Sequence, residues 1–394
     1  MLDLTLVFGI LVKQIKLNIM AKKELKDEKS KDNSIKPPYL PKELEKNIKF
    51  GKAKAKLDVS LLDIKSLLGH LNLPKNVSLK KLCINVEDSL NEIELKLNLP
   101  EFGKYEFPDD IAYNAINKDE FIIDPDTFVE LPPFHPNHLA ISPTPTPLSK
   151  RFQVIKNYFE KFPSEKENYA TTIFNPDDRR LFLDSSYPWG TVGLVQTALG
   201  SASGVMIGPR HLLTVSHIVQ WNSNSAGWIN FTPASFDGAA PFGTASGTRI
   251  YFRRKVIGPS LNRDEMQHDY VVVVLNSRIG NITGWMGSKS WSDGWDNQPY
   301  WAHVGYPGDL NSGSRSSFQS GIPLDGSFWD RERHTRIFHQ GDVWPGQSGG
   351  PFFAWWNNGP HAVAVQSAQN PGENTASGGS EMVDLVIRAR NEYP

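Results

Sequence analysis

The chain has 394 residues and a net charge of −1, which leaves room for two or three domains but gives no overall field that would attract nucleic acid. Its single cysteine, Cys83, excludes an intrachain disulfide. All 11 tryptophans lie after residue 170, whereas lysine is the main cation before that point, so we expect two separately built units.

The first 56 residues predict a charged and disordered tail, because lysine and acidic side chains dominate there. Residues 1–19 form a weak signal segment at most. Their apolar run is too short to span a bilayer, follows Asp3 rather than a lysine, and precedes no small-residue cleavage site. No membrane span is therefore expected, and the location is predicted as secreted or periplasmic, with the cytoplasm as the alternative.

Three further segments are expected before the tryptophan-rich part. Residues 57–130 predict a small mixed or β domain, since residues 93–99 alternate apolar and polar side chains with strand period. Residues 131–148 are rich in proline and predict a semi-rigid linker. Residues 149–170 carry apolar side chains at helical spacing, which predicts an amphipathic helix at the end of a prosegment.

Residues 171–394 predict an all-β domain, because short apolar runs alternate there with glycine, proline, asparagine and serine. The clearest strands are residues 192–196, 204–207, 212–215, 270–275 and 362–365. The last apolar stretch, residues 380–390, has helical spacing and predicts a C-terminal helix.

One turn in this domain suits nucleophilic chemistry. Residues 345–351 read Pro-Gly-Gln-Ser-Gly-Gly-Pro, with Ser348 between glycines. Such a turn can present a hydroxyl and leave backbone N–H groups directed at the same point, which acyl transfer requires. An ordinary loop explains the turn equally well when it is considered alone.

Two residues upstream complete a possible triad. His217 follows an apolar strand, and Asp269 precedes the run Tyr-Val-Val-Val-Val-Leu. Taken singly, each has a structural explanation, a core histidine or a strand-end acid. Together with Ser348 they give the order His, Asp, Ser within one cysteine-free β domain, and this conjunction is a strong signal for a serine peptidase.

Two rival hydrolase folds are excluded by residue order. Gly346 to Gly350 also fits the G-x-S-x-G pattern of α/β-hydrolases, but that fold needs an acid and then a histidine after the serine. Subtilisin-type enzymes place the acid first. A double β-barrel of chymotrypsin type with a C-terminal helix is the predicted fold class.

Residues 172–394 resemble the chymotrypsin-fold serine peptidases, in particular their glutamyl-endopeptidase-like branch. The motifs that carry the resemblance are residues 173–179, 187–189, 203–208, 213–217, 268–270, 305–309 and 342–351. The resemblance implies Ser348 as nucleophile, His217 as general base, Asp269 as its partner, and the N–H groups of Gly346 and Ser348 as the oxyanion hole. It also implies that Ser367 lies behind the Asp269–His217 pair.

The resemblance fails at the specificity pocket. In this branch a histidine and a hydroxyl bind the substrate glutamate, but Gln366 and Val343 stand at the matching positions. Asp342 could face a basic substrate residue, although a structural role is the better hypothesis. With Ser367 these residues form the predicted substrate pocket, and a preference for glutamate is in doubt.

We therefore expect a monomeric serine endopeptidase acting on proteins or peptides, without cofactor or metal. The acidic residues 109–126 lack calcium-loop spacing, and the histidines suggest no zinc site. If the N-terminal region is removed, the cut is expected near Thr171 or Thr172. The alternatives are a catalytically silent homologue that binds protein, and a structural role for the N-terminal region.

Overall fold

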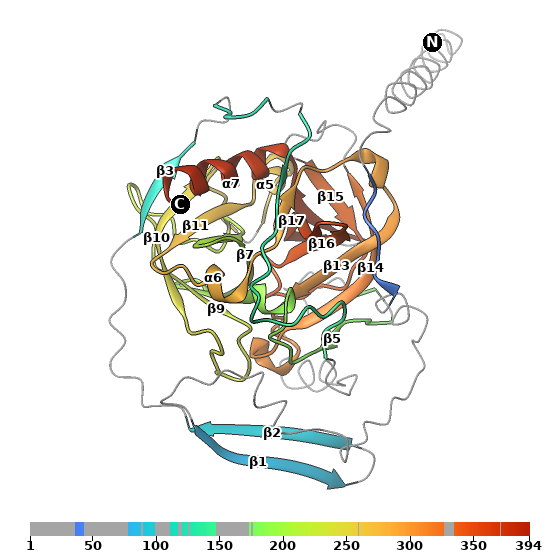
Figure 1. Cartoon of the computed structure of the whole chain (residues 1–394). Coiled ribbons are helices and arrows are strands. Elements are labelled where there is room, and N and C mark those ends of the chain that lie inside the picture. Colours follow the sequence, from blue (N-terminus) through green and yellow to red (C-terminus); the bar gives the residue numbers. More distant parts are fainter. Residues whose placement is uncertain are drawn as a thin grey trace, which may run out of the picture.

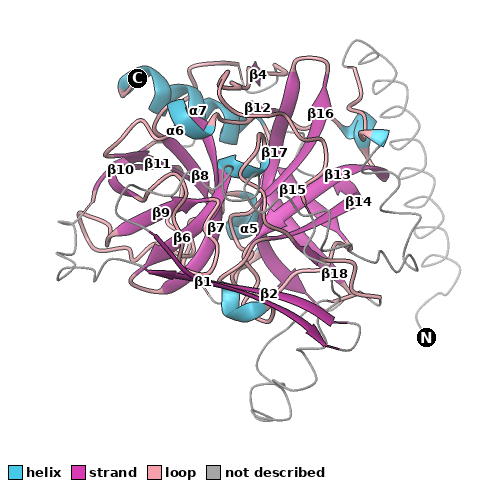
Figure 2. Cartoon of the chain, turned by 60° about the horizontal axis from the view of Figure 1, so that its bottom comes forward, coloured by secondary structure: helices cyan, strands magenta, loops and turns pink. Residues whose placement is uncertain are grey.

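The structure is a computed structural model that describes residues 36–42, 78–87, 90–98, 111–116, 120–124, 127–146, 173–174, 176–258, 260–326, 335–370 and 372–394. Apart from one two-stranded sheet, its strands gather into two groups that lie side by side (Figures 1 and 2). The charged segment 1–35, most of the remaining tail, the helix expected over residues 149–170 and the expected cut at Thr171 or Thr172 lie outside the described residues.

The first group is a closed barrel of six antiparallel strands, in the order β11-β8-β7-β6-β9-β10, with β11 also pairing β10. Its strands are β6 (Val192–Thr197), β7 (Gly200–Gly208), β8 (His211–Thr214), β9 (Ile229–Pro233), β10 (Ala245–Phe252) and β11 (Val271–Leu275). Alternate β11 side chains point to opposite faces, so Val271 and Val273 fill the barrel while Val272 and Val274 pack outside it. Two buried faces explain the continuous apolar run.

The second group is also a closed six-stranded barrel, in the order β16-β13-β14-β15-β18-β17, with β16 also pairing β17. Its strands are β13 (Gln298–Gly305), β14 (Ser317–Gly326), β15 (Thr335–His339), β16 (Pro351–Trp356), β17 (Gly359–Asn370) and β18 (Glu373–Gly378). Two short strands attach outside the ring: β5 (Arg180–Leu181) on β14 and β12 (Gly287–Lys289) on β17. Trp291, Trp295 and Trp301 are buried in its core.

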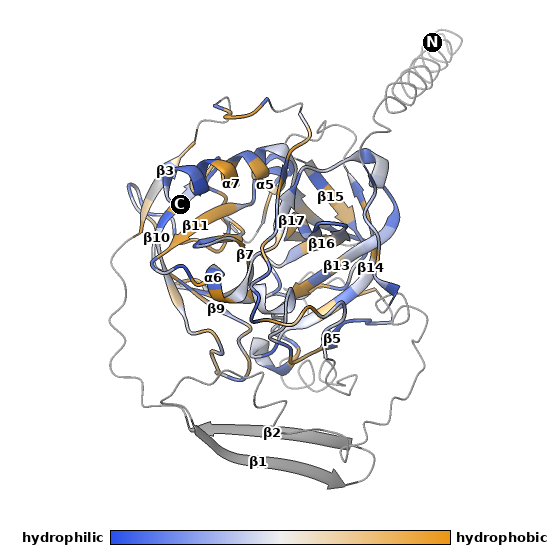
Figure 3. Cartoon of the chain, viewed as in Figure 1, coloured by the Kyte–Doolittle hydropathy of each residue, from blue (hydrophilic) through white to orange (hydrophobic). Residues whose placement is uncertain are grey.

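Among the residues that the structure describes from 176 onward, helices are few and, apart from the last one, short. They are α5 (Arg263–Gln267), α6 (Gly280–Thr283) and α7 (Ser380–Glu392), with the 3-10 turns η2 (Trp189–Thr191), η3 (Asp293–Trp295) and η4 (Asn311–Gly313). The predicted C-terminal helix is α7, which Figure 3 colours partly as hydrophobic. Its buried Met382, Val383 and Val386 pack on the first barrel and on the core between the barrels. Within the described part of the chain, no helix is long and apolar enough to cross a membrane.

The described residues between 111 and 146 (111–116, 120–124 and 127–146) contact both barrels and are called the strap here. In the strap, β3 (Ala112–Ala115) extends the first barrel by pairing parallel with β10 (Figure 1). β4 (Glu130–Leu131) pairs with β12, which is attached to the second barrel (Figure 2). Bridges at Phe134 and Ile141 join it to Trp285 and Tyr187. The expected division into a small domain to residue 130 and a semi-rigid, proline-rich linker to residue 148 stays a prediction, and the described residues of this stretch pair their backbone with barrel strands.

Two other N-terminal pieces are described. β1 (Ser78–Glu87) and β2 (Leu90–Asn98) pair antiparallel, and β2 includes the strand predicted from the alternation. Residues 36–42, which fall in the expected disordered tail, contact the second barrel instead. Tyr39 N–H donates to Trp355 O at 2.9 Å and Trp356 Nε1 donates to Lys36 O at 3.0 Å.

Candidate active site

Strand pairing in the first barrel brings His217 and Asp269 together. The last residue of β8, Thr214, pairs with the first residue of β11, Val271, in antiparallel register. The end of β8 and the beginning of β11 therefore lie next to each other. His217 lies three residues after the one and Asp269 two residues before the other, so the closeness of the two side chains follows from this register.

The Asp269 carboxylate is fully buried and accepts four hydrogen bonds. Oδ1 accepts from the backbone N–H groups of Ser216 and His217, both at 2.9 Å. Oδ2 accepts from His217 Nδ1 at 2.6 Å and from Ser367 Oγ at 2.6 Å. Because a carboxylate only accepts, this arrangement fixes the proton of the neutral imidazole on Nδ1 and leaves Nε2 as the basic nitrogen.

The His217 ring has a raised pKa. Burial of the imidazole acts to lower it, but the charge of Asp269 and the hydrogen bond to Asp269 outweigh burial and raise the pKa above 6.5. Asp269 thus stabilises the imidazolium that forms when the ring takes a proton.

The turn around Ser348 depends on its glycines. Gly346 has a φ of 101° and Gly349 a φ of 81°, both in the left-handed region. A Cβ on Gly346 would lie 2.3 Å from Tyr306 O, and one on Gly349 would lie 2.2 Å from Ser203 O. Within the part of the chain that the structure describes, the N–H groups of Gly346 and Ser348 donate to no acceptor, so both are available to a substrate oxygen.

Backbone contacts bring this turn up to the His217–Asp269 pair. Gly349 N–H donates to Gln366 O at 2.8 Å, and the next residue, Ser367, donates to Asp269. Ser203 N–H of β7 donates to Ser348 O at 2.8 Å. Among the described residues, however, no hydrogen bond joins Ser348 Oγ to His217. The structure therefore joins His217, Asp269 and Ser367 directly and places Ser348 in the adjoining turn.

The predicted pocket residues are buried, and their polar atoms have partners inside the protein. Asp342 accepts the N–H groups of Phe174 at 2.7 Å and Asp178 at 2.9 Å, which supports the structural role and not the binding of a basic substrate. Val343 is fully buried. Ser367 bonds to Asp269 instead of facing a pocket.

Gln366 belongs to a neutral hydrogen-bonded chain. Its Oε1 accepts from His339 Nε2 at 2.8 Å, and its Nε2 donates to Ala368 O at 3.0 Å. Burial lowers the pKa of His339 to about 3, so this ring is uncharged at neutral pH. Among the described residues, neither Gln366 nor its partner His339 supplies a positive charge at neutral pH at this position.

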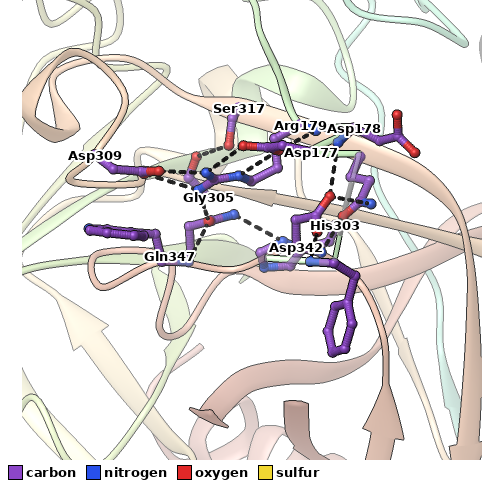
Figure 4. A network of polar contacts seen from close by, with 12 residues as sticks. Asp177, Asp178, Arg179, His303, Gly305, Asp309, Ser317, Asp342 and Gln347 are labelled. Atoms are coloured by element: carbon purple, nitrogen blue, oxygen red, sulfur yellow. Dashed lines mark hydrogen bonds and ion pairs between the residues drawn. The ribbon is translucent and has the colours of Figure 1, made fainter. Parts of the chain in front are cut away.

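A network around Gln347 was not found from the sequence. The buried amide of Gln347 contacts Arg179, and Arg179 contacts two acids, Asp177 and Asp309 (Figure 4). An arginine beside acidic residues in a polar stretch usually indicates a solvated surface, so no sequence signal marked it. No cluster of three or more potential metal ligands occurs among the residues that the structure describes.

Comparison with known proteins gives one curated relative and several structural neighbours. No family model matches the chain. A glutamyl endopeptidase of Bacillus licheniformis is 25% identical over 236 residues, which cover 58% of this chain and 71% of that protein. A Glu endopeptidase structure in complex with MPD has a TM-score of 0.44 at 23% identity and covers 56% of this chain and 99% of its own. The protease Anisep from Arthrobacter nicotinovorans has a TM-score of 0.40 at 20% identity and covers 51% and 92%.

The sequence match and the fold agree. Two closed six-stranded β-barrels followed by a C-terminal helix are the chymotrypsin architecture expected from the motifs. The curated relative matches over most of its own length. The chain has the double-barrel architecture of the chymotrypsin type, and its sequence is similar to that of a glutamyl endopeptidase, which supports a serine peptidase.

Proposed function

We propose that the chain is an endopeptidase in which Ser348, His217 and Asp269 act as a catalytic triad. The observation that carries the proposal is the 2.6 Å bond from His217 Nδ1 to the buried Asp269 carboxylate. This bond prepares Nε2 to accept a proton from a serine hydroxyl. The glycine turn with two N–H groups unused within the described residues supplies the second requirement, stabilisation of the oxyanion.

The reaction follows from these positions. Ser348 Oγ attacks the peptide carbonyl carbon while its proton passes to His217 Nε2, and the N–H groups of Gly346 and Ser348 donate to the oxyanion. When the tetrahedral intermediate collapses, the C–N bond breaks and the leaving amine takes the proton from Nε2. A water then attacks the acyl ester with His217 again as base, which releases the new carboxylate and restores the Ser348 hydroxyl.

The absence of a Ser348–His217 hydrogen bond among the described residues is also compatible with an active enzyme. In free enzymes catalytic hydrogen bonds are often long and tighten only with substrate. A serine Oγ also moves by rotation about a single bond, χ1. Both points favour an active enzyme, whereas a binding protein would have no use for two open N–H groups beside a serine.

A fluorophosphonate probe tests the proposal, because it reacts only with a serine that is activated as a nucleophile. We expect labelling of the wild-type chain at Ser348 and none in Ser348→Ala, with an unchanged folded signal in circular dichroism. Ser201→Ala, at an exposed position of the β6–β7 hairpin, is the matched control and should label fully. Absence of labelling in the folded wild-type chain would favour the silent homologue.

Substrate and location also belong to the proposal. The pocket residues are uncharged apart from Asp342, whose carboxylate is held by backbone N–H groups, so we propose an uncharged side chain at the substrate position before the cleaved bond. We further propose that the enzyme acts as a monomer on exported or extracellular proteins. Mass analysis in solution and assay of culture supernatant test these two points.

A further inference from the structure

Arg179 forms a buried cluster of charges next to the Ser348 turn. Its Nη1 donates to Asp309 Oδ1 at 3.0 Å and its Nη2 to Asp309 Oδ2 at 2.5 Å (Figure 4). Nε and Nη2 also donate to the two oxygens of Asp177 at 3.1 and 2.9 Å. The Arg179 side chain is fully buried and that of Asp309 almost so, whereas Asp177 is partly exposed. A buried guanidinium needs such partners, and here the two carboxylates satisfy it.

One further hydrogen bond connects this cluster to the turn around Ser348. Arg179 Nη1 donates to Gln347 Oε1 at 3.0 Å, and the same oxygen accepts the Trp344 N–H at 2.9 Å. Gln347 Nε2 lies 3.4 Å from His303 Nδ1, an imidazole whose pKa burial lowers to about 3 and which is therefore neutral. Both ends of the Gln347 side chain thus have fixed partners.

The position of Gln347 makes this anchoring relevant to catalysis. Gln347 lies between Gly346 and Ser348, whose N–H groups are the proposed oxyanion donors. Its own N–H closes the turn by donating to Trp344 O at 3.0 Å. A Cβ on Gly305, the last residue of β13, would lie 3.1 Å from the Cα, Cβ and Cγ of Gln347. The absence of a side chain at Gly305 therefore leaves room for Gln347.

We propose that Arg179 is a positioning residue that holds the Gln347 amide, and through it the oxyanion turn, in working shape without any chain cleavage. The inference rests on the proposed function of Ser348. In trypsin-type enzymes an acid at the position of Gln347 pairs with an N-terminus freed by cleavage. Here the donor is a side chain within the polypeptide, so a cut ahead of Asp177 neither creates nor removes the contact.

We therefore expect the uncleaved enzyme to be competent, because the Arg179–Gln347 contact needs no freed N-terminus. The wild-type 394-residue chain, treated with a fluorophosphonate and analysed by intact mass, should carry the label while it is still full length. The inference is overturned if only a product shortened at the N-terminus is labelled. If no form is labelled, the proposed function itself fails, so the two failures are distinguishable.

Substitution of Arg179 tests the positioning role. Arg179→Met should lower kcat by about 10²-fold, the scale of losing one oxyanion donor, with KM nearly unchanged because the turn acts on the transition state. Arg179→Lys keeps the positive charge but lacks the planar guanidinium, so its kcat should lie between those of the wild type and Arg179→Met. Arg315→Met removes the bidentate ion pair to Asp237, which has no hydrogen bond to the Ser348 turn among the described residues, and is the matched control, with wild-type kcat expected. Wild-type kcat in a folded Arg179→Met chain would overturn the inference.

A pH readout separates positioning from general stability, and it remains usable where Arg179→Met folds poorly. In Gln347→Glu the new carboxylate pairs with Arg179, and we expect at least one-tenth of wild-type kcat from pH 6 to 9. Asp309→Asn leaves Arg179 with one fewer carboxylate partner. The double variant Gln347→Glu with Asp309→Asn supplies another carboxylate, so its kcat should be higher than that of Asp309→Asn alone. Absence of this rescue, with both chains folded, would contradict the contact.

Discussion

Ser367 Oγ donates to Asp269 Oδ2 at 2.6 Å, and this bond joins β17 of the second barrel to the acid that precedes β11 of the first. The same carboxylate oxygen accepts from His217 Nδ1. The orientation of the imidazole therefore depends on both barrels, which explains why the proposed triad lies where they meet.

Ser367→Ala should lower kcat by about tenfold while the protein stays folded. A hydrogen bond to a charged group contributes about 1.5–3 kcal/mol, and only the part that orients Asp269 affects the transition state. Ser367→Thr keeps a hydroxyl and serves as the control. Steady-state kinetics on a peptide substrate measure the effect, and equal kcat in the alanine variant and the wild type would show that the bond has no catalytic role.

Asp269→Asn should lower kcat by about 10⁴-fold, as in related triads, because an amide can donate to Nδ1 and so favours the wrong tautomer of His217. The circular dichroism spectrum should be retained. A loss below tenfold would mean that His217 is not the base.

The raised pKa of His217 gives a pH prediction with a definite sign. The neutral ring is the base, so kcat/KM should fall as pH drops through the folded pKa, and the midpoint of this acid limb should lie above 6.5. For stability, protonation favours the folded state. The contribution of this group is thus fully present below pH 6.5 and is lost as pH rises through the folded pKa. A pH–rate profile and urea unfolding at several pH values measure the two effects, and an acid limb below 6.5 would contradict the geometry around Asp269.

Gly349→Ala should destabilise the protein and abolish fluorophosphonate labelling. The substitution combines a left-handed φ of 81° with a Cβ that would meet Ser203 O at 2.2 Å. Gly243→Ala is a matched control, since its φ is 84° but nothing lies within 4 Å of the added Cβ. Backbone strain alone costs about 1–3 kcal/mol, so the control reports strain and the difference reports the overlap. Equal unfolding free energies for the two variants would exclude a close approach at Gly349.

The barrel strands and α7 could be predicted from sequence because each is carried by a local pattern. The apolar run that predicts β11 and the helical spacing that predicts α7 are each contained within the segment that forms the element. The His217–Asp269 contact was predictable only through the family motifs, although its cause is one strand register. The Gln347–Arg179 contact and the strap were not predictable, because each joins segments distant along the chain whose own composition is that of polar or proline-rich loops.

The contacts of the strap determine whether the N-terminal part of the chain stays bound after cleavage. Ile111 and Ile116 are buried in the cores, Ile111 exchanges backbone hydrogen bonds with Ala226, and Asp384 of α7 accepts the N–H groups of residues 122 and 123. Glu130 pairs with the buried Lys289. Since these contacts do not depend on continuity with the second part of the chain, the strap should stay bound after a cut between residues 150 and 170.

A recognition site for a specific protease, inserted between residues 150 and 170, tests this. After complete cleavage the two fragments should co-elute in gel filtration and separate only in denaturant. Ile111→Asp should release the N-terminal fragment, because it places an unpaired charge in a fully packed site. Ile141→Asp is the matched control, since that side chain is 55% exposed and should leave the fragments together. Separation of the wild-type fragments in native buffer would instead mean that the N-terminal region is shed on cleavage, as a removable prosegment would be.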